Sequence, residues 1–98
     1  NFIPPSNDIE KELVEIWSEV LKLPTNVIGA NTSFFELGGH SLLASLLANR
    51  ISEKFKVKFE LKEIFIKKSI IAQGDFIQLN NWLLNTKTNE NEATEITI

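Results

Sequence analysis

The sequence predicts an all-α domain: a small antiparallel bundle of three main helices plus one short helix, with a long loop between helices 1 and 2. Three observations predict it. Apolar residues recur at helical spacing in three separate segments. Only one short segment alternates like a strand, and it has no second strand to pair with. The chain has 98 residues, of which 43% are hydrophobic, so it can form one compact core.

The first helix is predicted to begin near Asn7 and to end before Pro24. Asn7 and Glu10 make a capping-box-like pair, with Ser6 as an alternative cap. The apolar positions that follow lie on one face of a helix. They are Ile9, Leu13, Ile16, Trp17, Val20 and Leu21.

Residues 23–40 form a long connection for so small a domain, which usually indicates a functional loop. Val27 and Ile28 are expected to reach into the core. The adjacent Phe34 and Phe35 also require burial, so we expect the loop to be held against the helices rather than to move freely.

The second helix is predicted to start at or just after Ser41. Its core positions are Leu43, Leu47, Ile51 and Phe55, with Ala44 and Ala48 alongside. Leu42 and Leu46 lie to one side of that stripe. A short helical turn is expected at residues 61–65. Ser69 can cap a last helix, whose predicted stripe is Ala72, Phe76, Leu79 and Leu83. Gly74 inside that helix costs about 1 kcal/mol relative to alanine.

The chain divides into an N-terminal linker (1–6), a folded domain (7–84) and a flexible polar tail or linker (85–98). It contains no methionine, so we expect a piece of a longer or processed polypeptide. No apolar run approaches 18 residues, and the start does not resemble a signal peptide. We therefore expect a cytoplasmic protein that does not span a membrane and is a monomer as an isolated domain.

Several function classes are disfavoured by composition. The chain has no cysteine and one histidine, His40, so no metal site is expected. Its lysines cluster between residues 54 and 68, but acidic residues are interleaved with them and the net charge is −3. A protein partner is therefore more plausible than nucleic acid.

Catalysis by this chain alone is also disfavoured. Ser41 follows His40, but a nucleophile elbow needs glycine where Leu43 stands, and a triad histidine comes from elsewhere in the fold. Gly38-Gly39 lacks the lysine and serine or threonine of a phosphate-binding loop. No catalytic residue is predicted.

The same segment is better suited to accept a covalent group. A serine at a helix start lies beside unpaired N–H groups and the positive end of the helix dipole, which favour a phosphodiester. The two glycines give an enzyme room to approach, and Leu42 and Leu46 offer an apolar landing patch. The alternative interpretation makes Ser41 a helix N-cap, the glycines a turn and the leucines core. It does not explain the long aromatic loop.

Phe34-Phe35-Glu36-Leu37-Gly38-Gly39-His40-Ser41-Leu42-Leu43-Ala44 closely resembles the motif of peptidyl (thiolation) carrier domains of nonribosomal peptide synthetases. The resemblance extends upstream to the segment Ile16-Trp17-Ser18-Glu19-Val20-Leu21. Downstream it includes Arg50-Ile51, Phe65 and Ser69-Ile70, so that it spans about residues 3–77.

The resemblance implies that Ser41 receives 4′-phosphopantetheine from coenzyme A through a phosphopantetheinyl transferase, with Gly39 and His40 at the cofactor site. The arm then carries aminoacyl or peptidyl groups as thioesters to adenylation, condensation and thioesterase or other tailoring domains. His40 favours the peptidyl type over acyl carriers, which generally have Asp there. Leu42, Leu46, Phe35 and Leu37 would form the partner interface. The alternative is an unmodified helical docking or adaptor module with a carrier-like fold.

The sequence departs from the family pattern at three places. Asn31 or Ser33 stands about where the family has Asp before the Phe-Phe pair. Leu46 occupies a position that is often basic, which leads us to expect that it tunes partner choice. Gln73-Gly74 replaces the usual Leu-Ala, so the last helix is expected to be shorter or kinked there.

Overall fold

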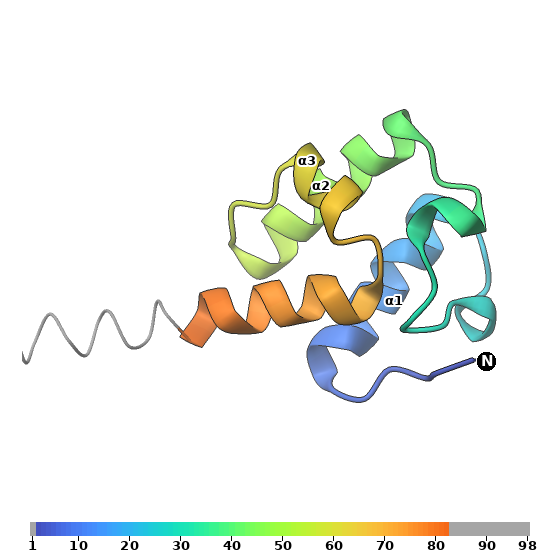
Figure 1. Cartoon of the computed structure of the whole chain (residues 1–98), viewed down its shortest axis with the longest axis horizontal. Coiled ribbons are helices and arrows are strands. Elements are labelled where there is room, and N and C mark those ends of the chain that lie inside the picture. Colours follow the sequence, from blue (N-terminus) through green and yellow to red (C-terminus); the bar gives the residue numbers. More distant parts are fainter. Residues whose placement is uncertain (1, 83–98) are drawn as a thin grey trace, which may run out of the picture.

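The computed structural model describes residues 2–82, and every regular element in that range is helical. The helices are α1 (Asp8–Leu21), α2 (Ser41–Phe55) and α3 (Leu61–Ile66), with the short 3-10 turns η1 (Thr25–Val27) and η2 (Phe34–Leu37) between α1 and α2. A last helix, here named the 70–82 helix, follows α3 (Figure 1). The predicted all-α fold is confirmed. The predicted tail at 85–98 and the end of the predicted domain at 84 lie outside the described residues.

The start of α1 follows the predicted capping pattern with one change. The Asn7 side chain accepts a hydrogen bond from the Glu10 N–H at 2.8 Å, so Asn7 is the N-cap. The Glu10 carboxylate accepts from the N–H and the hydroxyl of Ser6, at 2.8 and 3.1 Å, and not from Asn7. These bonds satisfy donors that a helix start leaves unpaired. Glu10 is therefore buried, although the sequence pattern had suggested only a capping role.

Trp17 of α1 lies at the centre of the core and is fully buried. Its ring meets Phe34 edge-on, with centroids 5.2 Å apart. Its indole N–H donates to the Gln73 side-chain oxygen at 3.0 Å, and the Gln73 amide donates to the Lys67 carbonyl at 2.9 Å. One buried residue of the 70–82 helix thus joins α1 to the segment that follows α3.

The predicted stripe of the 70–82 helix is wrong in register. Its buried residues are Ile70, Gln73, Gly74 and Ile77, whereas Leu79 and Trp82 are 56% and 60% exposed. Leu83, the last member of the predicted stripe, lies outside the described residues. The helix turns this way because Gln73 has two buried partners and Gly74 packs closely on α1. A Cβ on Gly74 would lie 3.3 Å from the Cγ of Glu10. The helix is continuous through residues 73 and 74, so it is not shortened there as expected.

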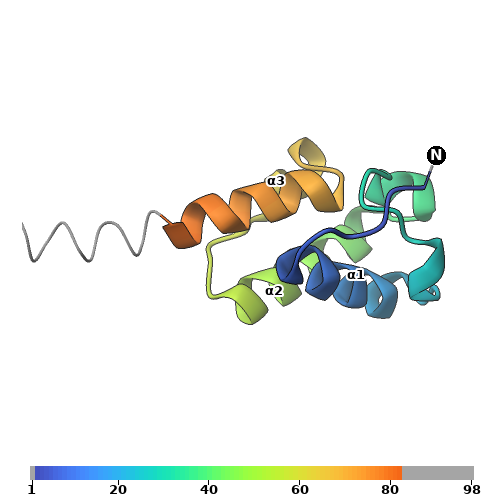
Figure 2. The same cartoon turned by 90° about the horizontal axis from the view of Figure 1, so that it is seen from below.

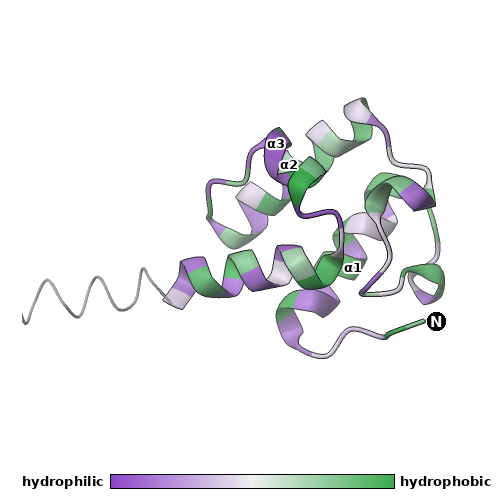
Figure 3. Ribbon diagram, viewed as in Figure 1, coloured by the Kyte–Doolittle hydropathy of each residue, from purple (hydrophilic) through white to green (hydrophobic). Residues whose placement is uncertain are grey.

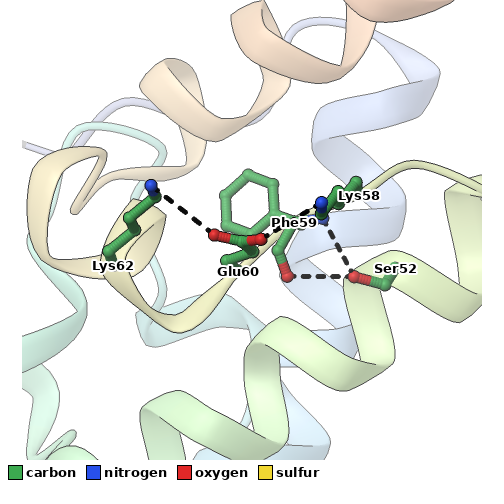
Figure 4. A network of polar contacts seen from close by, with 5 residues as sticks. All are labelled: Ser52, Lys58, Phe59, Glu60 and Lys62. Atoms are coloured by element: carbon green, nitrogen blue, oxygen red, sulfur yellow. Dashed lines mark hydrogen bonds and ion pairs between the residues drawn. The ribbon is translucent and has the colours of Figure 1, made fainter.

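The link between α2 and α3 is closed by Ser52 (Figure 4). Its hydroxyl donates to the Phe59 carbonyl at 3.0 Å and accepts from the Phe59 N–H at 3.1 Å. Phe59 is thereby held in the core against Phe76 of the 70–82 helix, with ring centroids 5.3 Å apart. Glu60 also pairs with Lys58 and Lys62, each at 3.6 Å. Such exposed pairs contribute little to stability.

The long loop is held from two sides, as the sequence predicted, but of its two expected core residues only Ile28 is buried, and Val27 is exposed. The Ala30 N–H donates to the Ile3 carbonyl of the lead-in segment at 2.6 Å, and the Ala30 carbonyl accepts from the Ile71 N–H at 3.0 Å. The Phe34 N–H donates to the Lys68 carbonyl at 2.8 Å. Figure 2 shows the lead-in segment passing alongside this loop before it enters α1. The loop is thus tied to the body of the domain at Ala30 and at Phe34, the first residue of η2.

None of the helices in residues 2–82 is long and apolar enough to cross a membrane.

Candidate functional site

The candidate site is built on the turn that joins η2 to α2. Ser33 caps η2 by accepting from the Phe35 N–H at 3.2 Å, which makes Ser33, and not Asn31, the cap of this turn. Gly38 ends η2 in the left-handed region, at φ = 100°, a conformation that glycine adopts at no steric cost. The Gly39 N–H then donates to the Phe34 carbonyl at 3.1 Å. The backbone is therefore held in place as far as Gly39, two residues before Ser41.

Gly39 is required for a different reason from Gly38. A Cβ on Gly39 would lie 2.8 Å from the Phe34 carbonyl oxygen and closer still to two carbons of the Phe34 ring. Phe34 is fully buried between Trp17 and Phe35, so it has little room to move. The backbone before α2 thus lies directly on the core, and only glycine fits there.

Ser41 is the first residue of α2, and its N-cap is His40. The interpretation of Ser41 as a helix cap is therefore not supported. The His40 side chain makes no capping hydrogen bond, and the first helical bond runs from the Ala44 N–H to the His40 carbonyl at 2.7 Å. The N–H groups of Ser41, Leu42 and Leu43 precede that bond and have no helical partner. The Ser41 side chain is exposed, and no residue in the range 2–82 hydrogen-bonds its hydroxyl.

These features fit a phosphodiester on Ser41. The hydroxyl is accessible and is not engaged in another bond, and free N–H groups at the positive end of a helix stabilise a negative charge beside it. Gly38 and Gly39 place no side chain over the approach to Ser41. His40 is exposed beside it. No group of three or more metal-binding side chains occurs among residues 2–82.

The predicted partner residues divide into two kinds. Leu42 and Leu46 on α2 are 69% and 48% exposed, so they are free to contact another protein. Phe35 and Leu37 are half-buried and pack against the core. Phe35 also stacks on Phe65 of α3, with centroids 5.1 Å apart and planes 15° apart. The structure therefore joins the loop to α3 beside the site.

The contribution of α3 to this surface was not predicted from the sequence. Phe65 and Ile66 are 42% and 69% exposed, and they belong to the hydrophobic end of α3, which is green in Figure 3. A short helix with three consecutive apolar residues, Ile64 to Ile66, cannot bury all of them. That pattern was a usable signal for an exposed apolar end.

Comparisons with known proteins agree with this geometry. The family described as "Phosphopantetheine attachment site" matches residues 11–77. Gramicidin S synthase 2 of Brevibacillus brevis is 42% identical over 76 residues, which are 78% of this chain and 2% of that synthase. This chain therefore spans a very small part of the curated relatives that it matches.

Two solved structures have the same fold. One is the solution structure of a non-covalent extended docking domain complex of the Pax NRPS, with a TM-score of 0.79 and 34% identity. The match covers 100% of this chain and 91% of that one. The other is a peptidyl carrier protein solved with the phosphopantetheine transferase Sfp and coenzyme A. Its TM-score is 0.74 and its identity 32%, over 80% of this chain and 99% of that one.

Proposed function

The chain belongs to the phosphopantetheine attachment family and is a peptidyl carrier domain, and from this premise we propose that Ser41 carries its 4′-phosphopantetheine arm. The observation that supports Ser41 as the attachment residue is its position and exposure in the fold. It is an exposed residue at the first position of α2, and its hydroxyl has no partner within residues 2–82. The bound arm supplies a thiol that holds an aminoacyl or peptidyl group as a thioester.

The chain's own residues have limited tasks in attachment. The Ser41 oxygen attacks the phosphorus next to the pantetheine of coenzyme A, the P–O–P bond of the diphosphate breaks and adenosine 3′,5′-bisphosphate leaves. The free N–H groups at the start of α2 stabilise the phosphodiester that results. The base that takes the Ser41 proton comes from the transferase, since no described carboxylate or imidazole hydrogen-bonds the hydroxyl. Gly39 holds Ser41 in place by lying on Phe34. The domain is not itself a catalyst in this proposal.

We further propose that Leu42 and Leu46 form the centre of the surface on which partners dock. Phe35 and Leu37 support it from the loop. The first partner is a phosphopantetheinyl transferase, as in the relative solved with Sfp. Adenylation, condensation and thioesterase domains use the same surface in turn, in the cytoplasm. Exposed leucines at the centre of a protein contact give affinity through buried apolar area.

The alternative function, an unmodified adaptor module, has less in its favour. An adaptor needs no free hydroxyl at the start of α2, and a serine there would ordinarily be the N-cap. Here His40 takes the N-cap position, and the serine stands one residue inside the helix.

The test is the intact mass of the protein after incubation with coenzyme A and a promiscuous phosphopantetheinyl transferase. The wild type should gain one phosphopantetheinyl group, and Ser41→Ala should gain none. Ser45→Ala is a matched control, because it removes a hydroxyl from the same helix one turn later and should still be modified. A modified Ser41→Ala would refute the assignment of Ser41.

A further inference from the structure

The serines of the chain divide into two groups by their hydrogen bonds. There are seven serines, all in the range 2–82. Five of them use their hydroxyls within the fold: Ser6, Ser18, Ser33, Ser52 and Ser69. The two whose hydroxyls have no partner among the described residues are Ser41 and Ser45. They are one turn apart on α2, at the proposed attachment site.

The helix places Ser45 beside whatever is attached to Ser41. Residues four apart lie on the same face of an α-helix, with Cβ atoms about 6 Å apart. Helical side chains also tilt toward the N-terminus, so the Ser45 side chain leans over the turn that begins with Ser41. The neighbouring positions Ala44 and Ala48 are buried, and Ser45 is half-buried at the edge of the core face. Its Cα–Cβ bond is therefore tilted along α2 toward the start of the helix.

A phosphodiester on Ser41 offers two non-bridging oxygens at this place, which share one negative charge. The N–H groups of the first turn of α2 can reach it from the helix end, and Ser45 can reach it from the side. Leu46, the neighbour of Ser45, supplies no charge or donor, so the phosphodiester lacks a basic side chain from that position. A hydroxyl donor to a charged oxygen makes a stronger bond than one to a neutral acceptor.

We propose that Ser45 donates a hydrogen bond to a non-bridging oxygen of the phosphodiester that joins the arm to Ser41. The inference rests on the proposed attachment at Ser41. Ser45 acts as a positioning residue: it restricts rotation about the bonds between the Ser41 side chain and the phosphorus. The first segment of the arm is thereby directed along α2, past the exposed side chains on which partners dock. Serine suits the position because it is small enough to leave room for the arm.

The test compares holo proteins in which only the donor changes. The variants are Ser45→Ala, which removes the hydroxyl, and Ser45→Thr, which keeps it. Asn49→Ala is the matched control, because it removes a polar group from the next turn of α2. Each variant is modified with coenzyme A and a transferase, its mass is checked, and its phosphodiester is observed by phosphorus NMR. The unfolding equilibrium of the apo and holo forms is then measured in urea.

We expect the phosphorus resonance to shift in Ser45→Ala and to stay near the wild-type position in Ser45→Thr and Asn49→Ala. Modification should also stabilise the wild type more than Ser45→Ala. The unfolding equilibrium constants should differ by a factor of about ten, the low end of the range for one hydrogen bond to a charged group. If Ser45 had a merely structural role, its substitution would change the unfolding equilibrium of the apo and holo forms equally.

Two results would overturn the inference, and they are distinguishable. One result is that every variant gains the arm and yet shows the same phosphorus resonance and the same difference in unfolding equilibrium between holo and apo forms. In that case Ser45 does not contact the phosphodiester. If the wild type gains no mass, the proposed attachment fails, and the inference about Ser45 fails with it.

Discussion

Gly39→Ala is the substitution that most directly tests how the fold places Ser41. The added methyl group would lie 2.8 Å from the Phe34 carbonyl oxygen and closer to the Phe34 ring. Ordinary contacts of this kind are about 3.4 Å or longer, so the ring or the backbone before α2 must move. Phe34 is fully buried against Trp17 and Phe35, so its movement disturbs the centre of the core.

The expected cost follows from this overpacking. Forcing one extra carbon into a well-packed core typically costs about 1–3 kcal/mol. For a domain of this size, each kcal/mol lowers Tm by about 4–8 °C, so Gly39→Ala should lower Tm by about 5–20 °C. The displaced turn also carries Ser41. Since misplacing a reacting group by about 1 Å can cost up to about a hundredfold in rate, attachment of the arm should slow by about tenfold or more.

The assay combines thermal unfolding, near-UV circular dichroism and the rate of modification. Gly38→Ala is the matched control. Its Cβ meets nothing within 4 Å, but its φ of 100° strains any residue except glycine. Gly38→Ala should therefore lose about 1–2 kcal/mol through the backbone while the near-UV signal of Trp17 and Phe34 stays unchanged. A Gly39→Ala protein with wild-type Tm and near-UV spectrum would refute the packing argument.

Three further substitutions test other parts of the account. Gln73→Leu should destabilise the domain by about 1–3 kcal/mol in urea unfolding, because the buried Trp17 N–H loses its acceptor; an unchanged free energy of unfolding would contradict that role. Ser52→Ala should lower the free energy of unfolding by about 1–2 kcal/mol and speed amide exchange at Phe59, since both bonds to that residue disappear. Leu46→Arg should change stability by less than about 0.5 kcal/mol but alter KM for at least one partner. If Leu46→Arg and the wild type had equal KM values with every partner, Leu46 would not belong to the docking surface.

Most of the fold could be predicted because local signals agreed with the tertiary structure. The apolar spacing of α1 placed Leu13, Ile16 and Trp17 in the core, and the cap at Asn7 marked its start. The second helix was predicted to start at or just after Ser41, and α2 begins at Ser41. The short α3 was also predicted, to within one residue at its end.

The register of the 70–82 helix could not be predicted from its apolar spacing. Its buried face contains Gln73 and Gly74, which a hydrophobic pattern counts as exposed or as weak points. Gln73 is buried because Trp17 and the Lys67 carbonyl, both distant in sequence, pair with it. Gly74 is buried because α1 lies close to it at Glu10. Tertiary pairing of this kind has no local signal.

At the candidate site, the sequence pointed to Ser41 as the attachment residue, but it predicted only some of the contacts that hold the chain around Ser41. Gly38-Gly39 was interpreted as clearance for an enzyme, whereas the structure adds that Gly39 lies on Phe34. That His40 and not Ser41 takes the N-cap position required backbone angles. Phe65 and Ile66 were missed, although three consecutive apolar residues on so short a helix signal an exposed apolar end; which of the three lie exposed depends on how α3 turns toward Phe35.

The most direct test of the central claim is to locate the arm on the modified wild-type protein. Modification with coenzyme A and a transferase, followed by proteolysis and fragmentation mass spectrometry, assigns the phosphopantetheinyl group to a residue. The account predicts the group on Ser41 alone, with Ser45 unmodified on the same peptide. A group found on Ser45 or on any other serine, or a folded protein that gains no group, would contradict it.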